Sequence, residues 1–468
     1  MPQPSSARPT AASRPFDLKL SENVEAIAIS IAMALILKFF IIEAYQIPTG
    51  SMQPTILGDR AAGIHDRVLA DKLITMLRDP LRWEVMIFRF PLDERRLYVK
   101  RIVGLPGETL EVLGGDIWVD GRIARKPDHV NASVLKTIAD DDSGLDIGRW
   151  FTASDGVQVA GTRATFPTTH DTDTRIVLRR HVIDDYGHGY DPRWGIAPGI
   201  GGDHAVADLD VDFAAMLGPD SDALHVIFES DEGECVVVLP REGSAEIARL
   251  ELRTSDGDPR VLPIDGSPAL PAGVELRIAA RHVDRQVLVQ VDGEVWLRYD
   301  DDSSGARPAK PRKGRVALAL PGGGAVDDVV VRRDIFYLPR TPFFTGPSGR
   351  WEIPEDSYFG MGDNTQGSHD SRSWETMTYR LADGTEVEGF WFPGPSRGIA
   401  PPDANPQHLP GDQLGFADIH GDTRVFARAD IVEQRREVAP FIHERYLLGK
   451  AGLVFWPVVD PFRWKLIR

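Results

Sequence analysis

A serine and a lysine have the residue types of a nucleophile and of the base that would activate it. Ser51 directly follows Gly50, so its hydroxyl has no bulky neighbour on that side. A serine hydroxyl is a poor nucleophile until a base removes its proton. Lys100 is the candidate base, because its apolar neighbours Val99 and Ile102 would favour the neutral amine over the ammonium. The two residues predict nucleophilic catalysis by a Ser–Lys pair.

Each of these residues alone also has an ordinary interpretation, as an exposed turn serine and a lysine on a strand edge. Histidine is the usual alternative base, and the chain contains 12 histidines. The G-x-S-x-G pattern of an elbow that would pair one of them with a serine occurs once, at residues 394–398, within a stretch for which the sequence predicts loops with a few strands. The Ser–Lys interpretation therefore depends on the motifs that accompany the pair.

The only long apolar run, residues 27–42, ends shortly before the serine turn. Only Lys38 is charged within it, and a bilayer span needs roughly 20 mostly apolar residues. A cleavable signal peptide is disfavoured, because residues 43–48 make a poor small-residue cleavage site. A buried core helix is the remaining alternative. We expect a single membrane anchor over residues 20–44.

The segment before this run, residues 1–19, is rich in Pro, Ser, Ala and Thr and predicts a disordered tail. Its cations favour a cytoplasmic N-terminus; they are Arg8, Arg14 and Lys19. The chain would then be a single-pass protein of the cytoplasmic (inner) membrane. Everything after the anchor would face the extracytoplasmic side.

The remaining sequence predicts a mainly β fold in which one unit is inserted into another. Residues 45–133 alternate short apolar strands with turns, and the same texture returns over residues 337–468. Residues 134–336 are acidic and strand-rich, which is typical of a jelly-roll or concanavalin-like β-sandwich. We expect this insertion to fold on its own and to contribute nothing directly to catalysis. Residues 376–435 predict only loops with a few strands.

Composition excludes several classes of site and partner. The net charge of −17 argues against nucleic acid, whose phosphates require clustered Lys and Arg. Cys235 is the only cysteine, so an intramolecular disulfide is impossible. Aspartates such as those at 300–302 indicate solvated acidic loops, because the spaced ligand pattern of a calcium loop is absent. No metal and no cofactor is expected.

A third motif, Gly362-Asp363-Asn364 followed by residues 368–372 (Ser-His-Asp-Ser-Arg), completes the pattern. Together with the anchor that runs into residues 44–55 and with residues 96–108, it resembles bacterial type I signal peptidases of the Ser–Lys class. Residues 449–451 add to the resemblance. It implies a membrane-anchored serine endopeptidase with a signal-peptidase-like β-fold, which removes N-terminal signal peptides from exported preproteins at the lipid bilayer. The large insertion and the missing second anchor depart from the family pattern.

The resemblance also implies a role for each residue of the motifs. Ser51 would attack the peptide carbonyl, and Lys100 would be the general base. Thr49 would help the Ser51 amide to form the oxyanion hole, and Ser368 would orient the lysine amine. Four charged residues would form supporting ion pairs, which are Asp363 with Arg101 and Asp370 with Arg372.

Substrate choice would depend on shallow apolar pockets that admit only small side chains at the first and third positions before the cut. The residues expected to line them are Ile47, Pro48, Met52, Ile56, Tyr98 and Val99. The extended peptide would pair with strand edges near Gln46 and Tyr98.

Two alternatives belong to other kinds of protein. A self-cleaving repressor of the SOS-response type shares a Ser–Lys dyad, but it would need a DNA-binding helix-turn-helix and no anchor. An anchored glycan- or protein-binding module with a vestigial peptidase domain is the alternative outside the enzymes. An intact Ser51, Lys100 and Ser368 argue against it. A glycan or a protein ligand of the sandwich is nevertheless an expectation, because such folds host many functions.

Overall fold

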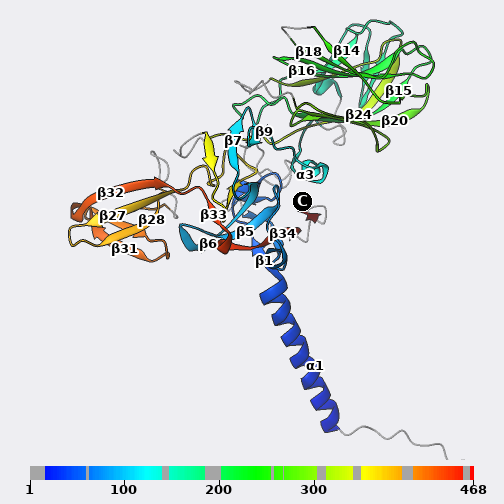
Figure 1. Ribbon diagram of the computed structural model, residues 1–468. Helices are drawn as coiled ribbons and strands as arrows, with labels where there is room; N and C mark the ends of the chain where they lie inside the picture. Colours follow the sequence, from blue (N-terminus) through cyan, green and yellow to red (C-terminus); the bar gives the residue numbers. More distant parts are fainter. Residues whose placement is uncertain are drawn as a thin grey trace, which may run out of the picture.

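A computed structural model describes most of the chain (Figure 1). The described residues are 16–59, 63–139, 147–184, 202–254, 258–266, 268–302, 313–340, 349–392, 404–456 and 464–467. Residues 1–15 of the predicted tail lie outside them. A long helix leads into a β-rich body, from which a β-sandwich and a smaller β-lobe project in different directions. The prediction of a mainly β chain is confirmed.

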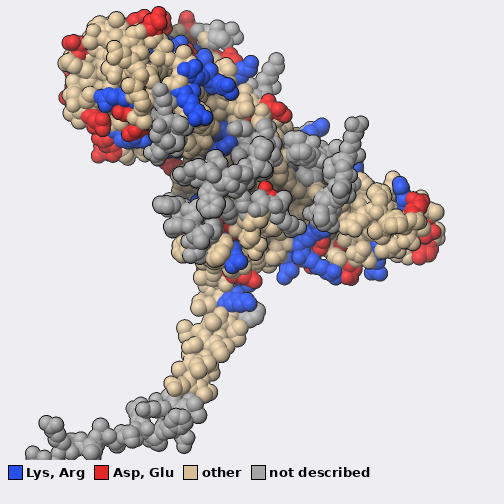
Figure 2. Space-filling view, turned by 180° about the vertical axis from the view of Figure 1, so that it is seen from behind, with Lys and Arg blue, Asp and Glu red and all other residues tan. Residues whose placement is uncertain are grey.

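The first helix extends away from the body. Helix α1 (Phe16–Ile36) continues as the π-helical turn η1 (Leu37–Ile41), which joins strand β1. Apolar side chains are exposed along this helix, with Ile27 at 59% and Met33 at 58%, and the part of the helix that is not grey is mainly tan, without charge, on the face that Figure 2 shows. Within the described part of the chain, we find no helix whose length and apolar character suffice to cross a membrane.

The body is built on an eight-stranded antiparallel sheet that combines both ends of the chain. Its order is β1–β4–β34–β5–β6–β26–β33, and β35 pairs with β34. The strands are β1 (Ile42–Gln46), β4 (Arg67–Asp71), β5 (Val85–Phe90), β6 (Asp93–Gly104), β26 (Ser357–Met361), β33 (Ile442–His443), β34 (Leu447–Trp456) and β35 (Lys465–Leu466). Strand β34 lies between β4 and β5. The C-terminal segment is therefore needed to complete the sheet.

A second, four-stranded sheet packs beside the first and has the order β25–β7–β8–β9. Its strands are β7 (Thr109–Leu113), β8 (Asp116–Val119), β9 (Arg122–Ile123) and β25 (Arg350–Glu352). Strands β7, β8 and β9 follow one another along the chain as an antiparallel meander. The short elements of the body are η2 (Gly50–Met52), β2 (Gly58–Asp59), β3 (Ile64–His65), α2 (Ile74–Leu77), α3 (Asp128–Val134), β33 and η6 (Glu444–Tyr446).

The insertion forms two stacked antiparallel sheets around one large apolar core. One sheet has the order β12–β13–β24–β15–β20–β21–β22, with β10 pairing with β24, and the other β11–β14–β23–β16–β17–β18–β19. The strands are β10 (Lys136–Ala139), β11 (Phe151–Ala153), β12 (Gln158–Ala160), β13 (Arg163–Phe166), β14 (Arg175–Leu178), β15 (Leu209–Leu217), β16 (Ala223–Ser230), β17 (Gly233–Pro240), β18 (Arg249–Thr254), β19 (Arg260–Pro263), β20 (Glu275–Val283), β21 (Gln286–Val291), β22 (Glu294–Asp300), β23 (Arg315–Ala319) and β24 (Gly324–Arg333), and the turn η3 spans Ile147–Arg149.

The two ends of the sandwich lie next to each other. Strand β10 opens the insertion and β24 closes it, and Lys136 lies opposite Arg333 in their antiparallel register. A domain whose ends meet can be inserted into a surface loop without separating the strands on either side. This arrangement explains how the chain can leave the body before the insertion and supply further strands to the same sheet after it.

A small lobe occupies the region in which the sequence predicts only loops with a few strands. It contains two three-stranded sheets, β28–β27–β32 and β29–β30–β31. The strands are β27 (Glu375–Leu381), β28 (Glu386–Phe390), β29 (Gln407–Leu409), β30 (Gln413–Ala417), β31 (Thr423–Ala427) and β32 (Ile431–Val438), and η5 spans Arg428–Asp430. The lobe has an apolar cluster of its own around Tyr379 and Phe416. The described part of this region thus contains six strands, where the sequence predicts loops with a few strands.

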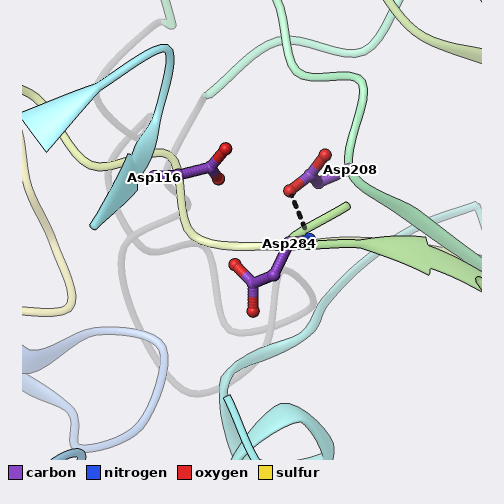
Figure 3. Close-up of side chains that lie close together, drawn as sticks. All are labelled: Asp116, Asp208 and Asp284. Atoms are coloured by element: carbon purple, nitrogen blue, oxygen red, sulfur yellow. Dashed lines mark hydrogen bonds between the residues drawn. The ribbon is translucent and has the colours of Figure 1, made fainter. Parts of the chain in front are cut away.

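The sandwich is joined to the body through a buried lysine. Lys126 Nζ lies 2.7 Å from Asp284 Oδ1 and 2.8 Å from Asp334 Oδ2, and all three side chains are almost fully buried. Burial lowers the pKa of Lys126, but the two carboxylates outweigh this effect and hold the pKa well above its ordinary value. Asp116 and Asp208 lie beside Asp284, whose backbone N–H donates to Asp208 (Figure 3). The junction is thus an electrostatic cluster rather than a flexible linker.

Aspartates elsewhere in the insertion are also paired with cations. Asp302 accepts a hydrogen bond from Arg125 of the body at 2.7 Å, and Asp301 pairs with Arg285 at 2.7 Å. The sequence predicts solvated acidic loops here, and the structure adds ion pairs to Asp301 and Asp302.

Candidate active site

Ser51 and Lys100 meet in the structure. Lys100 Nζ donates a hydrogen bond to Ser51 Oγ at 2.8 Å. The serine lies in turn η2, directly after the helix and β1, and the lysine lies near the middle of β6. Only 7% of Ser51 and 4% of Lys100 is exposed. A hydroxyl and an amine in this geometry can transfer a proton without an intervening water.

Burial changes the acidity of the lysine. Loss of hydration lowers the pKa of Lys100 to about 8, although the Asp370 carboxylate opposes the shift. Arg372 contributes in the same direction as burial, and Asp363 acts against it. A charged amine is disfavoured in a dry site, so this lysine can lose its proton near neutral pH.

Residues 362–372, hereafter the motif loop, hold the turn that carries the serine. The backbone N–H of Asn364 donates to the Ser51 carbonyl at 3.1 Å, and its side-chain amide donates to the Gly50 carbonyl at 3.2 Å. Gly362 lies so close that a Cβ there would collide with the Ser51 carbonyl oxygen and with Ser368. A glycine is required at this position because the two backbones pack directly against each other.

The predicted ion pairs both form, and both are fully buried. Arg101 donates from Nε and Nη2 to the two oxygens of Asp363, at 2.8 and 2.7 Å. Thr55 donates its hydroxyl to the same carboxylate, and Arg101 also donates to the backbone carbonyl of Trp83. This network connects β6, the turn after Ser51 and the motif loop.

The second pair closes the far end of the motif loop. Arg372 donates from Nε and Nη2 to the two oxygens of Asp370, at 2.8 and 2.6 Å. The same carboxylate accepts a hydrogen bond from the backbone N–H of Gly362 at 3.0 Å. Burial raises the pKa of Asp370, but Arg372 outweighs it and the pKa falls below its ordinary value. The ionised Asp370 carboxylate therefore links the beginning and the end of the motif loop.

Thr49 and Ser368 lie beside the serine turn, and the hydrogen bond expected between Ser368 and the lysine amine is not formed. Thr49 immediately precedes η2 and is exposed, and its side chain does not cap the turn. Ser368 is fully buried beside Gly362, and its hydroxyl has no hydrogen-bond partner among the residues that the structure describes. The roles of both residues stay predictions.

The expected pocket residues separate into two groups. Four of them pack in one apolar cluster with Val68 and Val85; they are Ile47, Met52, Ile56 and Val99. Tyr98 instead belongs to a cluster with Phe90 and Trp374 and stacks on Phe90 at 4.5 Å. Pro48 is half-buried between the first cluster and the serine turn. Because neighbouring residues of a strand point to opposite faces, Tyr98 and Val99 cannot line one wall together.

Sequence reasoning did not assign roles to two residues that the geometry brings to the site. Asn364 binds the backbone of the serine turn, as described above. His369 lies against Tyr98, with Nδ1 at 3.1 Å from the phenolic oxygen, and burial lowers its pKa to about 3. Both residues lie in the third sequence motif, residues 362–372. Their positions next to Asp363 and Ser368 are the sequence feature that could have indicated a role at the site.

Comparison with known proteins adds independent information. Residues 20–154 and 332–391 match the family described as signal peptidase, peptidase S26. Signal peptidase I of Leptolyngbya laminosa is 31% identical over 129 residues, which are 26% of this chain and 60% of that protein. Signal peptidase I of Pseudomonas aeruginosa is 45% identical over 85 residues, which are 17% of this chain and 30% of that protein. The chain thus spans 60% or less of the length of these two relatives.

Solved structures match part of the chain at low similarity. The carbohydrate-binding module CBM66 from Bacillus subtilis has a TM-score of 0.27 at 8% identity and covers 39% of this chain and 94% of that module. The endo-β-1,3(4)-glucanase SCLam of family GH16 has a TM-score of 0.28 at 10% identity and covers 49% of this chain and 97% of that enzyme. Likenesses at this level assign no function to the chain.

We predict that Asp363→Ala destabilises the protein by about 3–5 kcal/mol, because it leaves the Arg101 guanidinium buried without its counter-charge. The measurement is urea unfolding followed by tryptophan fluorescence. Glu386→Ala removes a solvent-exposed ion pair with Arg380 and serves as the control; its unfolding midpoint should match that of the wild type. Equal midpoints for both variants would show that the buried pair does not support the fold.

Proposed function

We propose that this chain is a membrane-anchored serine endopeptidase that removes signal peptides from exported preproteins, because residues 20–154 and 332–391 match the signal peptidase family, peptidase S26. One observation carries the proposal: a buried lysine amine lies 2.8 Å from the hydroxyl of a serine in a constrained turn. This is the arrangement that a Ser–Lys dyad requires.

The proposed reaction proceeds through an acyl-enzyme. Ser51 Oγ attacks the carbonyl carbon of the scissile bond while Lys100 takes the hydroxyl proton, which gives a tetrahedral intermediate. Lys100 then gives that proton to the nitrogen of the leaving mature chain, and the C–N bond breaks. A water, deprotonated by Lys100, hydrolyses the ester that joins the signal peptide to Ser51. The amine is returned to its neutral state when the serine recovers its proton.

The negative charge on the intermediate needs donors close to Ser51. We assign this role to the backbone N–H of Ser51 and the hydroxyl of Thr49, since Thr49 lies at the exposed start of the turn. Preorganised donors of this kind are worth roughly 2.7–4 kcal/mol each in acyl transfer. Asn364 supports the turn from behind through the carbonyls of Gly50 and Ser51.

The lowered pKa of Lys100 determines the fraction of enzyme molecules whose lysine amine is neutral and can accept the serine proton. With a pKa of about 8, about one molecule in ten has the neutral amine at pH 7, and the fraction rises with pH. An unperturbed lysine would have a neutral fraction smaller by more than two orders of magnitude. Burial of Lys100 therefore contributes directly to the rate near neutral pH.

The substrate would bind in extended form beside the segments that lead to Ser51 and Lys100. Strand β26 pairs with β6 from Arg101 to Gly104, and residues 97–99 of β6 lie just before this pairing. The segment 46–49 leads from β1 into the serine turn and lies near residues 97–99, because Ser51 touches Lys100. We propose that the residues before the cut occupy the space between these two segments. Val99 and the Ile47 cluster would then restrict the side chains that fit.

The lipid bilayer is the second proposed partner. We assign the anchor to α1 and η1, whose aliphatic side chains are exposed, and we place the catalytic body at the outer surface of the cytoplasmic membrane. The loop that contains α2 lies at the base of this helix, because the Lys72 N–H donates to the Ile41 carbonyl at 2.9 Å. Met76 and Leu77 on this loop are 70% and 76% exposed. Apolar side chains at this level would enter the interfacial region of the bilayer.

The alternative function, an anchored glycan- or protein-binding module with a vestigial peptidase domain, is less well supported. A degenerate site has no reason to keep the contact between Lys100 and Ser51 together with both buried ion pairs around it. A glycan or protein ligand of the sandwich stays a prediction that rests on architecture alone.

We predict that Ser51→Ala lowers preprotein cleavage in detergent by at least about a thousandfold, because no other group can form the acyl-enzyme. Ser230→Ala, at the end of a sandwich strand, is the matched control and should cleave at the wild-type rate. Circular dichroism should show the same spectrum for all three proteins. Substantial processing by the purified Ser51 variant would refute the nucleophile assignment.

We predict that kcat/KM for a signal-peptide substrate rises with pH through an apparent pKa of about 8, because the neutral form of Lys100 is the active one. Lys100→Arg should abolish this activity, since a guanidinium stays protonated. The measurement is a pH–rate profile in detergent. A limb near ~10 would mean that the lysine is hydrated like a free one.

We predict that a fluorophore at position 76 is quenched by lipids that carry a shallow spin label, because the α2 loop enters the bilayer interface. The probe would be attached to Met76→Cys of the full chain in vesicles, with the buried Cys235 replaced by alanine. The matched control is Val295→Cys on the sandwich, where the side chain is 51% exposed; it should not be quenched. Equal quenching at both sites would exclude a specific insertion of the loop.

A further inference from the structure

The motif loop touches the inserted sandwich. The Gln366 side chain, which is 4% exposed, donates from Nε2 to the backbone carbonyl of Asp184 at 2.8 Å. Beside it, Thr365 Oγ1 donates to the carbonyl of Phe336 at 2.7 Å. Asp184 and Phe336 both lie within residues 134–336. The insertion therefore contacts the loop that holds the catalytic serine.

Several contacts fix the position of Asp184, whose carbonyl accepts the hydrogen bond from Gln366. Its side chain is fully buried and accepts a hydrogen bond from the backbone N–H of His204 at 2.9 Å, with His204 Nδ1 at 3.0 Å. Its backbone N–H donates to the His204 carbonyl at 2.9 Å. The His204 ring stacks on Phe336 at 5.5 Å between ring centres. Asp184, His204 and Phe336 thus form one packed unit against the motif loop.

The other side of the loop faces the catalytic turn. Gln366 follows Asn364 by two residues, and Asn364 binds the carbonyls of Ser51 and Gly50. The Asn364 side chain also accepts a hydrogen bond from the Gly367 N–H at 3.1 Å. These contacts restrict movement of the Gln366 side of the loop relative to the Asn364 side. A restraint on Gln366 is therefore also a restraint on the backbone of Ser51.

Resting on the proposed peptidase function, we propose that Gln366 is a positioning residue and that the Asp184 carbonyl of the insertion keeps the motif loop, and through it Ser51, in reactive geometry. A displacement of about 1 Å at a reacting group can cost much of its rate. The insertion is then part of the framework of the active site, which differs from the independent domain that the sequence predicts.

The first test is the kinetics of Gln366→Ala in the full chain, with a short signal-peptide substrate in detergent. We expect kcat to fall on the order of 3- to 10-fold, the effect of one lost hydrogen bond on a positioned group, with KM unchanged. KM should not change, because Gln366 does not belong to the proposed substrate-binding segments, residues 46–49 and 97–99. A fall in folded fraction alone would be visible as a loss of titratable active sites.

The matched control is Gln286→Ala. Gln286 is a glutamine of the same insertion, is 9% exposed, and donates to Asp300 Oδ1 at 2.7 Å. Among the described residues, its side-chain hydrogen bonds go to Asp300 and Arg298, and none goes to the motif loop. Its loss should leave kcat and KM at their wild-type values. Gln366→Glu is the second variant, because it keeps the shape of the side chain and removes the donor; we expect a loss of kcat at least as large.

The second readout is amide hydrogen exchange, which does not depend on catalysis. The N–H groups of Asn364 and Gly367 should exchange several-fold faster in Gln366→Ala and Gln366→Glu than in the wild type and in Gln286→Ala. Unchanged exchange in this loop overturns the positioning role, and so does an effect on KM alone. If the wild type does not cleave but exchange responds as expected, the proposed function fails and the positioning role stands.

Discussion

A lysine can act as a base near neutral pH only while its amine is kept out of water. Most of the body can be understood from this constraint on Lys100. The amine lies under a buried serine turn and beside two carboxylates that would ordinarily raise its pKa. Each of these carboxylates is bound by two nitrogens of one guanidinium group. Asp363 is bound by Arg101, and Asp370 is bound by Arg372. The arginines compensate the negative charges, so burial remains the dominant influence on the lysine.

The same ion pairs assemble the site from distant parts of the chain. Ser51 comes from the turn after the first helix, Lys100 from β6, and the motif loop from beyond the insertion. Arg101 is adjacent to Lys100 and binds Asp363 of the loop and Thr55 of the serine turn at once. A buried charge that loses its partner is strongly unfavourable. The position of the motif loop is therefore coupled to the stability of the body.

Much of this arrangement could be predicted from the sequence, because chemistry restricts the residues that can perform it. The contact between Ser51 and Lys100 follows from their residue types, and both ion pairs follow from the family resemblance. In the sandwich, Asp292 and Gly293 both have positive φ, as the hairpin turn that an Asp-Gly pair favours requires. The strands of the small lobe have no such signature. In β32, seven of eight residues are exposed, so the alternation that marks a half-buried strand is missing.

Other features required the three-dimensional arrangement. The opposite orientations of Tyr98 and Val99 follow from the alternation of side chains along a strand, but which face meets the serine turn depends on the curvature of the sheet. The bond from Gln366 to Asp184 ends on a backbone carbonyl, which every residue has. A contact of this kind leaves no trace in residue type, and the two residues lie on either side of most of the insertion.

The junction at Lys126 shows that the insertion has become part of the body. The ammonium of Lys126 is buried against Trp83, with the ring centre at 5.2 Å, and its two carboxylate partners, Asp284 and Asp334, both belong to the inserted segment. Without those partners the body would contain a buried and uncompensated charge, which costs more than the pair gains. Trp83 also supplies the carbonyl that binds Arg101, so this cost would fall next to the active site. An insertion that merely occupied a surface loop could be removed without such a cost, whereas here the charge balance of the body requires it.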